Sequence, residues 1–188
     1  MKISVYITSY NKIQYIEQSI NSVLSQTLKP FEIVIIDDAS QDGSRGIIQS
    51  YASQYPNLIF PIFNENNLGI ANCRNKALCT LNGDLVTFLD GDDFFYPNKL
   101  ELEYKQLIKS QNTQVVYSNF NYLNESGKIT GSFAKETDNP ATGDIFINTY
   151  TRNYNIQLGR NYIYEMFYKN CAFEIGLYDT NIKIWEDW

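Results

Sequence analysis

The chain has 188 residues, of which 44% are hydrophobic and 19% are charged, and its formal net charge is −6. This composition is typical of one ordinary globular domain with a full core, and the negative charge argues against a protein that tracks nucleic-acid phosphates. The sequence contains no histidine, which excludes Ser-His-Asp and Cys-His nucleophilic sites and the usual zinc cages. Its chemistry must therefore use carboxylates, hydroxyls, lysine, arginine or an oxygen-ligated metal.

The cysteines and the apolar runs indicate the compartment. Cys73, Cys79 and Cys171 form neither a CxxC pair nor an even set, so we expect buried, reduced thiols. No apolar run approaches the roughly 20 residues of a membrane span, and the chain starts directly with strand-like sequence. We therefore expect a cytoplasmic protein, and peripheral association with the inner face of the membrane stays open.

Strands and helices are predicted to alternate along the first 109 residues. Short apolar runs predict strands at residues 3–7, 33–36, 58–63 and 85–89. Apolar residues at helical spacing predict helices with their apolar faces at residues 13–24, 47–55, 71–78 and 100–108. Asn11 is the predicted N-cap of the first helix, and Pro97 is placed in the first turn of the fourth. Pro61 cannot donate to a sheet, so the third strand belongs at an edge.

This alternation predicts an α/β fold with a parallel sheet that helices cover on both sides. The edge position of the third strand gives the strand order 3-2-1-4. In such sheets the ligand crevice lies outside the carboxyl ends of the strands, where the order reverses. The side chains expected to converge there are Thr8, Tyr10, Asp38, Asp90 and Asp92.

The pattern weakens after residue 109. We expect strands at 115–120, 128–133 and 162–168, a turn at 125–127, a loop at 134–143 and a helical turn at 170–175. No repeat, linker or low-complexity tract interrupts the chain. We therefore expect one domain over residues 1–188.

The most informative stretch is LVTFLDGDDFFYP, residues 85–97. It places three carboxylates, those of Asp90, Asp92 and Asp93, at the carboxyl end of a buried strand. Like charges so close repel one another unless a cation or several donors satisfy them, and a hard divalent metal is the simplest partner. The alternative is an acidic surface turn, because Asp-Gly is a common turn dipeptide.

Other motifs for nucleotides and metals fit poorly. The chain has neither GxGxxG nor GxxxxGK[ST], which argues against NAD enzymes and P-loop NTPases. An EF-hand loop numbered from Asp90 would have Phe94 and Phe95 at its fifth and sixth positions, where a ligand and a glycine are needed. A phosphohydrolase with Asp90 as nucleophile and Asp92 as acid is a nearer alternative, although its motif normally follows the first strand.

The chain resembles the family 2 glycosyltransferases, which have the GT-A fold of nucleotide-diphospho-sugar transferases, a Rossmann-like three-layer sandwich. The resemblance rests on the order and spacing of VYITSYNKIQYIEQSINSVLSQT, FEIVIIDDASQDGS, NNLGIANCRNKAL, GDLVTFLDGDDFFYPNKLE and a final Glu-Asp pair. It implies a nucleotide-sugar-binding half at residues 1–93 and an acceptor-side half at residues 94–188.

The resemblance also implies a base pocket in the first half. Thr8 and Tyr10 would line this pocket, and Asp38 would contact the edge of a uracil. Arg74 would approach the nucleotide or its phosphates, because its donors suit that role. Its place among apolar helix positions equally permits a structural ion pair.

The same resemblance assigns the acidic cluster to a metal. Asp90 and Asp92 match the DxD motif, with Asp92 as a direct ligand of Mn²⁺ or Mg²⁺, Asp90 near the ribose or metal, and Asp93 in support. Asp187 would be the catalytic base that activates an acceptor hydroxyl, and Glu186 would orient it. Family members continue beyond this pair whereas this chain ends at position 188, so we expect it to bind donor but to transfer sugar slowly or not at all.

These implications predict an inverting, metal-dependent glycosyltransferase. Its donor is expected to be a UDP-sugar, and its acceptor a hydroxyl of a glycan or a lipid-linked sugar in the biosynthesis of a surface polysaccharide. A non-catalytic sugar-nucleotide-binding domain is the first alternative, and the DxD phosphohydrolase is the second.

Overall fold

The computed structural model describes residues 1–109, 111–133 and 164–181. The chain divides into two compact units. Unit 1 comprises Met1–Val116 with Tyr164–Trp188, and unit 2 comprises Tyr117–Ile163.

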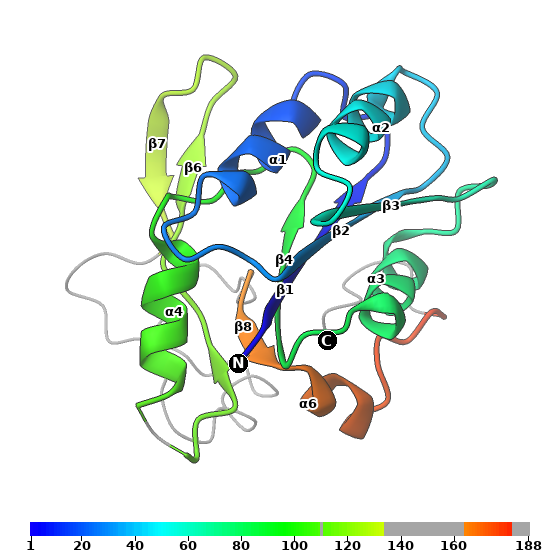
Figure 1. Cartoon of the computed structure of the whole chain (residues 1–188). Coiled ribbons are helices and arrows are strands. Elements are labelled where there is room, and N and C mark those ends of the chain that lie inside the picture. The colour runs from blue at the N-terminus through cyan, green and yellow to red at the C-terminus, as the bar shows by residue number, and fades with distance from the viewer. Residues whose placement is uncertain (110, 134–163, 182–188) are drawn as a thin grey trace. The chain divides into compact units, whose positions relative to one another are not determined.

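Unit 1 is built on one six-stranded sheet (Figure 1). Its strands are β1 (Ile3–Ser9), β2 (Glu32–Asp37), β3 (Ile59–Phe63), β4 (Leu85–Asp90), β5 (Val115–Val116) and β8 (Met166–Tyr168). The order is β3-β2-β1-β4-β8-β5, in which the first four strands are parallel and β8 is antiparallel to both of its neighbours. The predicted order 3-2-1-4 and the edge position of the Pro61 strand are confirmed.

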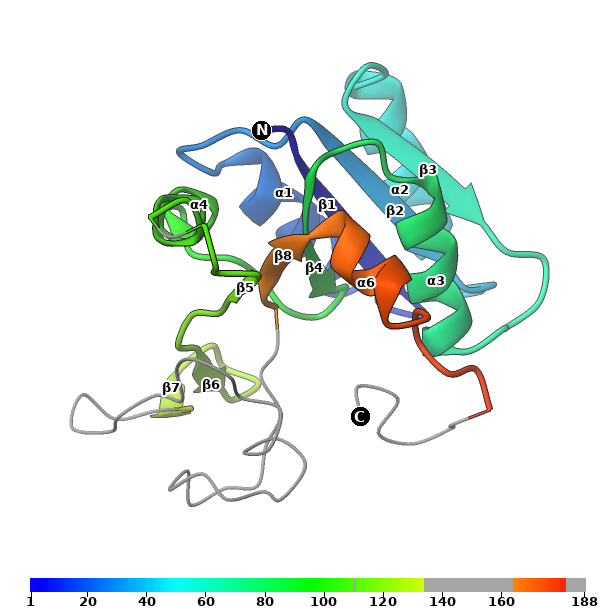
Figure 2. The same cartoon turned by 90° about the horizontal axis from the view of Figure 1, so that it is seen from below.

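Helices cover both faces of this sheet (Figure 2). They are α1 (Ile16–Leu24), α2 (Ser44–Gln54), α3 (Ile70–Thr80), α4 (Lys99–Leu107) and α6 (Lys169–Glu174). Helices α1, α2 and α4 pack on one face, and α3 and α6 pack on the other. Because side chains alternate along a strand, Val5 and Ile7 of β1 enter the first core and Tyr6 enters the second.

Unit 2 contains a β-hairpin of β6 (Asn121–Leu123) and β7 (Ile129–Ser132), which pair antiparallel. Its turn closes with a hydrogen bond of 2.8 Å from the Gly127 amide to the Asn124 carbonyl. The positive φ of Gly127, 76°, explains the glycine at this position. The predicted turn and the strand that follows it are therefore confirmed.

The first helix begins later than predicted, and Asn11 is not its N-cap. The helix starts at Ile16, whereas Asn11 has a left-handed φ of 53°. The Asn11 amide donates to Ser40 Oγ, and its side-chain oxygen accepts from the Gln41 amide. Asn11 thus links the loop after β1 to the loop after β2, at the carboxyl ends of the two strands.

Further differences lie at other boundaries. The strand predicted at residues 115–120 is only the two residues of β5, and Pro97 precedes α4 rather than lying in its first turn. The predicted loop at 134–143 and the start of the strand at 162–168 fall outside the described residues. Among the helices that the structure describes, none has the length and apolar character needed to cross a bilayer.

Candidate functional site

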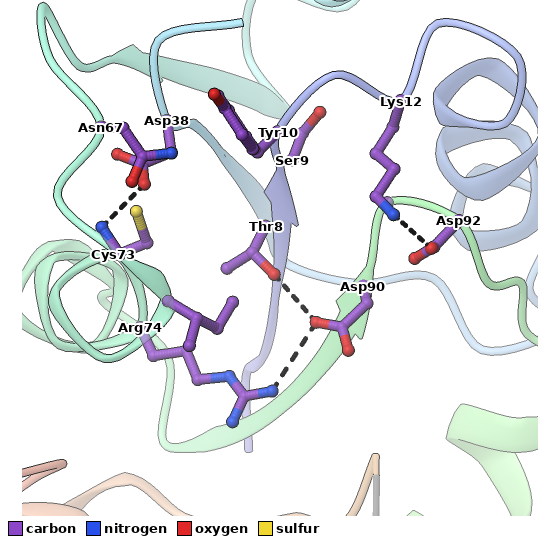
Figure 3. A pocket seen from close by; sticks show the side chains of 13 residues that line it. Thr8, Ser9, Tyr10, Lys12, Asp38, Asn67, Cys73, Arg74, Asp90 and Asp92 are labelled. Atoms are coloured by element: carbon purple, nitrogen blue, oxygen red, sulfur yellow. Dashed lines mark hydrogen bonds and ion pairs between the residues drawn. The ribbon is translucent and has the colours of Figure 1, made fainter. Parts of the chain in front are cut away.

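A cavity of about 390 Å³ opens at the carboxyl ends of β1, β2 and β4, beside the start of α3 (Figure 3). Its lining includes all of the side chains that were predicted to converge, together with Arg74 and Lys12. Strand register explains the convergence, because Thr8 of β1 pairs directly with Asp90 of β4. The predicted meeting of these residues at one cavity is confirmed.

At one end of the cavity, hydrogen bonds fix the carboxylate of Asp38. One of its oxygens accepts from Asn64 Nδ2 at 2.8 Å and from the Leu68 amide at 2.9 Å. The other oxygen accepts from the Gly69 amide at 2.9 Å. Gly69 has a φ of 85°, a conformation that residues with a side chain rarely adopt. Asp38 is therefore a buried, oriented hydrogen-bond acceptor.

Cys73, which also lines the cavity, is not prepared for nucleophilic chemistry. Burial, together with the nearby carboxylate of Asp38, raises the pKa of the thiol to about 12. Because only the thiolate is a strong nucleophile, Cys73 stays unreactive at neutral pH. The expectation of a buried, reduced thiol is confirmed for Cys73. Cys79 is exposed and Cys171 is half-buried, so the predicted burial is wrong for Cys79.

At the other end of the cavity, Asp90 lies between Thr8 and Arg74 (Figure 3). Thr8 Oγ1 donates to Asp90 Oδ1 at 2.9 Å, and an Arg74 guanidinium nitrogen lies 3.7 Å from the same oxygen. The Gly91 amide donates to the Thr8 carbonyl at 2.8 Å. A Cβ atom on Gly91 would lie 2.9 Å from that carbonyl oxygen, so the DGD sequence needs glycine at its centre.

Arg74 is a buried cation whose side chain is 5% exposed. Its guanidinium stacks over Phe88, 4.9 Å from the ring centroid, and over Tyr178 at 5.3 Å. The structural ion pair that the sequence left open is therefore present, and the same group faces the cavity. An arginine held in this way presents fixed donors, which a flexible lysine would not.

The remaining acidic residues have partners outside the DGDD sequence. Lys12 Nζ forms an ion pair with Asp92. The Tyr164 hydroxyl donates to Asp93 Oδ2 and lies 3.4 Å from Asp90 Oδ2. Loss of hydration raises the pKa of the Asp93 carboxyl. The hydrogen bond from Tyr164 acts to lower this pKa, and the nearby carboxylates raise it further. Burial, followed by those carboxylates, raises the pKa of the Tyr164 phenol well above its usual value, so the phenol remains a donor.

Sequence reasoning missed Lys12 and Tyr164. A signal for Lys12 was present, because it lies in the loop that directly follows the first strand, where the crevice was expected. Tyr164 lies 71 residues after Asp93, in a weakly patterned region, and no local signal marks it. The predicted catalytic pair, Glu186 and Asp187, lies outside the described residues.

The acidic residues can be tested for their fit to a divalent cation. Among the residues that the structure describes, no group of three or more His, Cys, Asp or Glu side chains is arranged to hold a metal ion. Asp90 and Asp92 nevertheless offer two carboxylates at the cavity. Mg²⁺ and similar hard cations bind through one or two carboxylates and complete their shell with substrate phosphates and water. The donor set therefore fits a cation shared with a diphosphate.

Comparison with known proteins gives the family. The sequence profile described as Glycosyl transferase family 2 matches residues 4–172. The chain belongs to glycosyltransferase family 2. The family match leaves the phosphohydrolase alternative without support.

A curated relative of this family 2 glycosyltransferase is the Escherichia coli UDP-Glc:alpha-D-GlcNAc-diphosphoundecaprenol beta-1,3-glucosyltransferase WfgD. It is 34% identical over 131 residues, which cover 70% of this chain and 50% of WfgD. Matches to three other curated relatives cover between 31% and 58% of their lengths. The chain thus spans about one third to three fifths of these relatives.

Solved structures of the same shape establish the GT-A fold of this glycosyltransferase. TarS 1-349 of S. aureus in complex with UDP has a TM-score of 0.75 and 24% identity, covering 100% of this chain and 53% of TarS. The mannosyltransferase PcManGT of Pyrobaculum calidifontis, in complex with GDP-Man and Mn²⁺, has a TM-score of 0.66 and 15% identity, covering 96% of this chain and 48% of that one. The predicted fold class is confirmed.

Proposed function

We propose that this family 2 glycosyltransferase is an inverting, metal-dependent enzyme that takes its sugar from a UDP-sugar. The observation that carries the proposal is the cavity itself, because it has a fixed acceptor, Asp38, at one end and the carboxylates of Asp90 and Asp92 at the other. A nucleotide sugar has matching ends, a base and a diphosphate. The UDP bound to TarS and the UDP-Glc in the name of WfgD support this donor class.

Asp38 is the proposed base-recognition residue. Its carboxylate already receives three N–H hydrogen bonds, so it is held in place as an acceptor and favours a base that presents an N–H donor. Uracil presents such a donor at N3 and guanine at N1, whereas cytosine and adenine have acceptors at the equivalent ring position. The UDP bound to TarS favours uracil between the first two. Thr8 and Tyr10 line the same cavity, and the half-exposed ring of Tyr10 offers a flat surface for the base.

Asp90 and Asp92 would hold the cation, for which Mn²⁺ bound to PcManGT gives support. When bound, such a cation stabilises the charge that develops on the leaving diphosphate. Arg74 and Lys12 now neutralise the two carboxylates. Once the carboxylates share a cation with the donor, Lys12 can turn its ammonium group to the phosphates, and Arg74 can offer them its fixed donors.

The acceptor hydroxyl would attack the anomeric carbon from the face opposite the diphosphate, which inverts the configuration without a covalent intermediate. We assign its deprotonation to Asp187, oriented by Glu186. The proposed acceptors are glycans or lipid-linked sugars of a surface polysaccharide, as the diphosphoundecaprenol in the name of WfgD suggests. Such acceptors would bring the protein to the inner face of a membrane as a peripheral protein.

A thermal-shift panel tests the proposal. Uridine, UDP, UDP-sugars, GDP, CDP and ADP are compared with and without Mn²⁺. Preferential stabilisation by uridine compounds, strengthened by Mn²⁺, is expected because ligands stabilise the state they bind. Equal responses to every nucleotide would contradict the assignment of Asp38. Binding without Asp187-dependent transfer to a lipid-linked acceptor would favour a non-catalytic nucleotide-sugar-binding domain.

A further inference from the structure

Tyr164 contacts the acidic residues of the site from a distant part of unit 1. It lies two residues before β8 in the chain, whereas Asp90 is the last residue of β4 and Asp93 lies three residues beyond it. Its hydroxyl donates to Asp93 Oδ2 and lies 3.4 Å from Asp90 Oδ2. The hydroxyl has one proton, so Asp93 receives the hydrogen bond and Asp90 only a long contact.

The ring of Tyr164 is held by aromatic packing. It meets Phe88 of β4 edge to face, with the ring centroids 5.6 Å apart, and meets Phe95 in the same manner at 6.3 Å. Phe88 lies two residues before Asp90, and Phe95 lies two residues after Asp93. The ring is therefore packed against both ends of the segment that contains the acidic residues, which restricts where its hydroxyl can point.

The backbone of Tyr164 is fixed by a buried lysine. Tyr164 has a left-handed φ of 62°, a conformation disfavoured for a residue with a side chain. Its carbonyl accepts a hydrogen bond of 2.6 Å from Lys99 Nζ, which also pairs with Glu103 at 2.6 Å. The side chains of this pair are 9% and 2% exposed. A buried ion pair on α4 thus holds the residue that contacts the acidic cluster.

We propose that Tyr164 is a positioning residue for the metal and diphosphate end of the site. Three carboxylates within four residues repel one another, and the hydrogen bond from Tyr164 keeps the carboxylate of Asp93 in one fixed place beside Asp90. Asp90 and Asp92, which line the cavity, can then share a cation with the donor. This inference rests on the function proposed above.

The test compares two ligands that differ only in the diphosphate. Uridine reports on the base end, and UDP with Mn²⁺ reports on both ends. Tyr164→Phe keeps the ring and removes the hydroxyl. We expect it to weaken Mn²⁺-dependent UDP binding about tenfold, since a hydrogen bond to a charged group is of that size, and to leave uridine affinity unchanged. A general loosening of the fold would weaken the binding of both uridine and UDP.

Tyr168→Phe is the matched control. Tyr168 lies in β8 and is half-buried, and its hydroxyl makes no hydrogen bond to any residue in the described parts of the chain. This variant should bind both ligands as the wild type does. Asp93→Asn provides the second arm, because Tyr164→Phe should cost much less in that background if the two side chains act together.

Each outcome decides the proposal. A loss confined to Mn²⁺-dependent UDP binding, and reduced in the Asp93→Asn background, supports it. Unchanged UDP binding by Tyr164→Phe, equal losses for uridine and UDP, or a full loss in the Asp93→Asn background overturns it while the proposed function stands. A wild-type chain that binds neither uridine nor UDP overturns both.

Discussion

Lys12 forms an ion pair with Asp92, and this contact joins the loop after β1 to the loop after β4. The two side chains are 34% and 39% exposed, so the pair contributes only about 0 to 1 kcal/mol to stability. The pair matters for the site, because Lys12 neutralises the carboxylate of Asp92, which we assign to the cation. A weak pair of this kind can be displaced by a divalent cation.

Replacing Lys12 should therefore have opposite effects on the metal and on the nucleotide. In Lys12→Gln, Mn²⁺ alone should bind a few times more tightly, because a competing positive charge is gone. UDP without metal should bind more weakly, because a cationic donor near the phosphates is lost. Electron paramagnetic resonance of free Mn²⁺ and calorimetry with UDP measure the two effects. Lys128→Gln, in the exposed hairpin turn, should change neither, and a Lys12→Gln variant with weaker Mn²⁺ binding would refute the competition.

Asp38→Asn should weaken the binding of uridine itself. The amide side chain replaces one acceptor oxygen with a donor that faces N–H groups of its own loop, so we expect a loss of roughly 1 to 3 kcal/mol in stability. Uridine affinity should fall at least tenfold, and discrimination between UDP and CDP should narrow. Calorimetric titration and thermal unfolding measure these changes. Glu65→Gln, an exposed residue of the neighbouring loop, should leave both unchanged.

Gly91→Ala should damage the site through the backbone. The added Cβ would lie 2.9 Å from the Thr8 carbonyl, so β1 and the loop after β4 must separate, at a cost of about 1 to 3 kcal/mol. Mn²⁺-dependent UDP binding should also be weaker in this variant. Gly46→Ala is the control, because no atom lies within 4 Å of a Cβ at that helical position, and alanine should be neutral or slightly stabilising there. Denaturant unfolding that ranks the two variants the other way would contradict this account.

Glu32 predicts a specific pH dependence of folding. Burial acts to raise the pKa of its carboxyl, but hydrogen bonds from Ser4, Asn82 and Gly83 outweigh that effect and lower it below the usual 4.5. The pKa of Glu32 is lower in the folded protein than in the unfolded chain, so its ionised carboxylate stabilises the fold above about pH 4.5. This contribution is lost as the pH falls through the folded-state pKa. Denaturant unfolding between pH 3 and 7 should therefore show a shallower acid dependence for Glu32→Gln than for the wild type. The exposed Glu125→Gln variant should retain the wild-type slope.

Asp187 and Glu186 give a prediction about catalysis. Asp187→Asn should leave UDP binding unchanged and abolish sugar transfer, because the proposed base acts on the acceptor and not on the nucleotide. Glu186→Gln should slow transfer less. A radiolabelled-sugar transfer assay beside a UDP titration separates the two effects. Full transfer by Asp187→Asn would show that another group is the base.

Much of the nucleotide half could be predicted from the sequence, because its signals are local. The buried strands are short apolar runs, and Pro61 alone was enough to place β3 at the edge. Since parallel strands end at one side of a sheet, the polar residues that follow Ile7, Ile36 and Leu89 had to meet. The cavity confirms that meeting.

The failures have a different physical origin. Asn11 has the residue type and spacing of an N-cap, yet its side chain bonds across to the loop after β2 instead, a choice that depends on tertiary contacts. Lys12 pairs with a residue 80 positions away, and Tyr164 with one 71 positions away. Such contacts leave no local pattern, so only the fold reveals them.

The most direct test of the central claim is calorimetric titration of the wild type and Asp92→Asn with UDP, each with and without Mn²⁺. The account predicts that Mn²⁺ strengthens UDP binding at least tenfold in the wild type and has no such effect in Asp92→Asn, while uridine binds both proteins equally. Asp179→Asn, another exposed aspartate, should behave as the wild type. Binding of UDP that ignores Mn²⁺, or that keeps its full Mn²⁺ dependence in Asp92→Asn, would contradict the account.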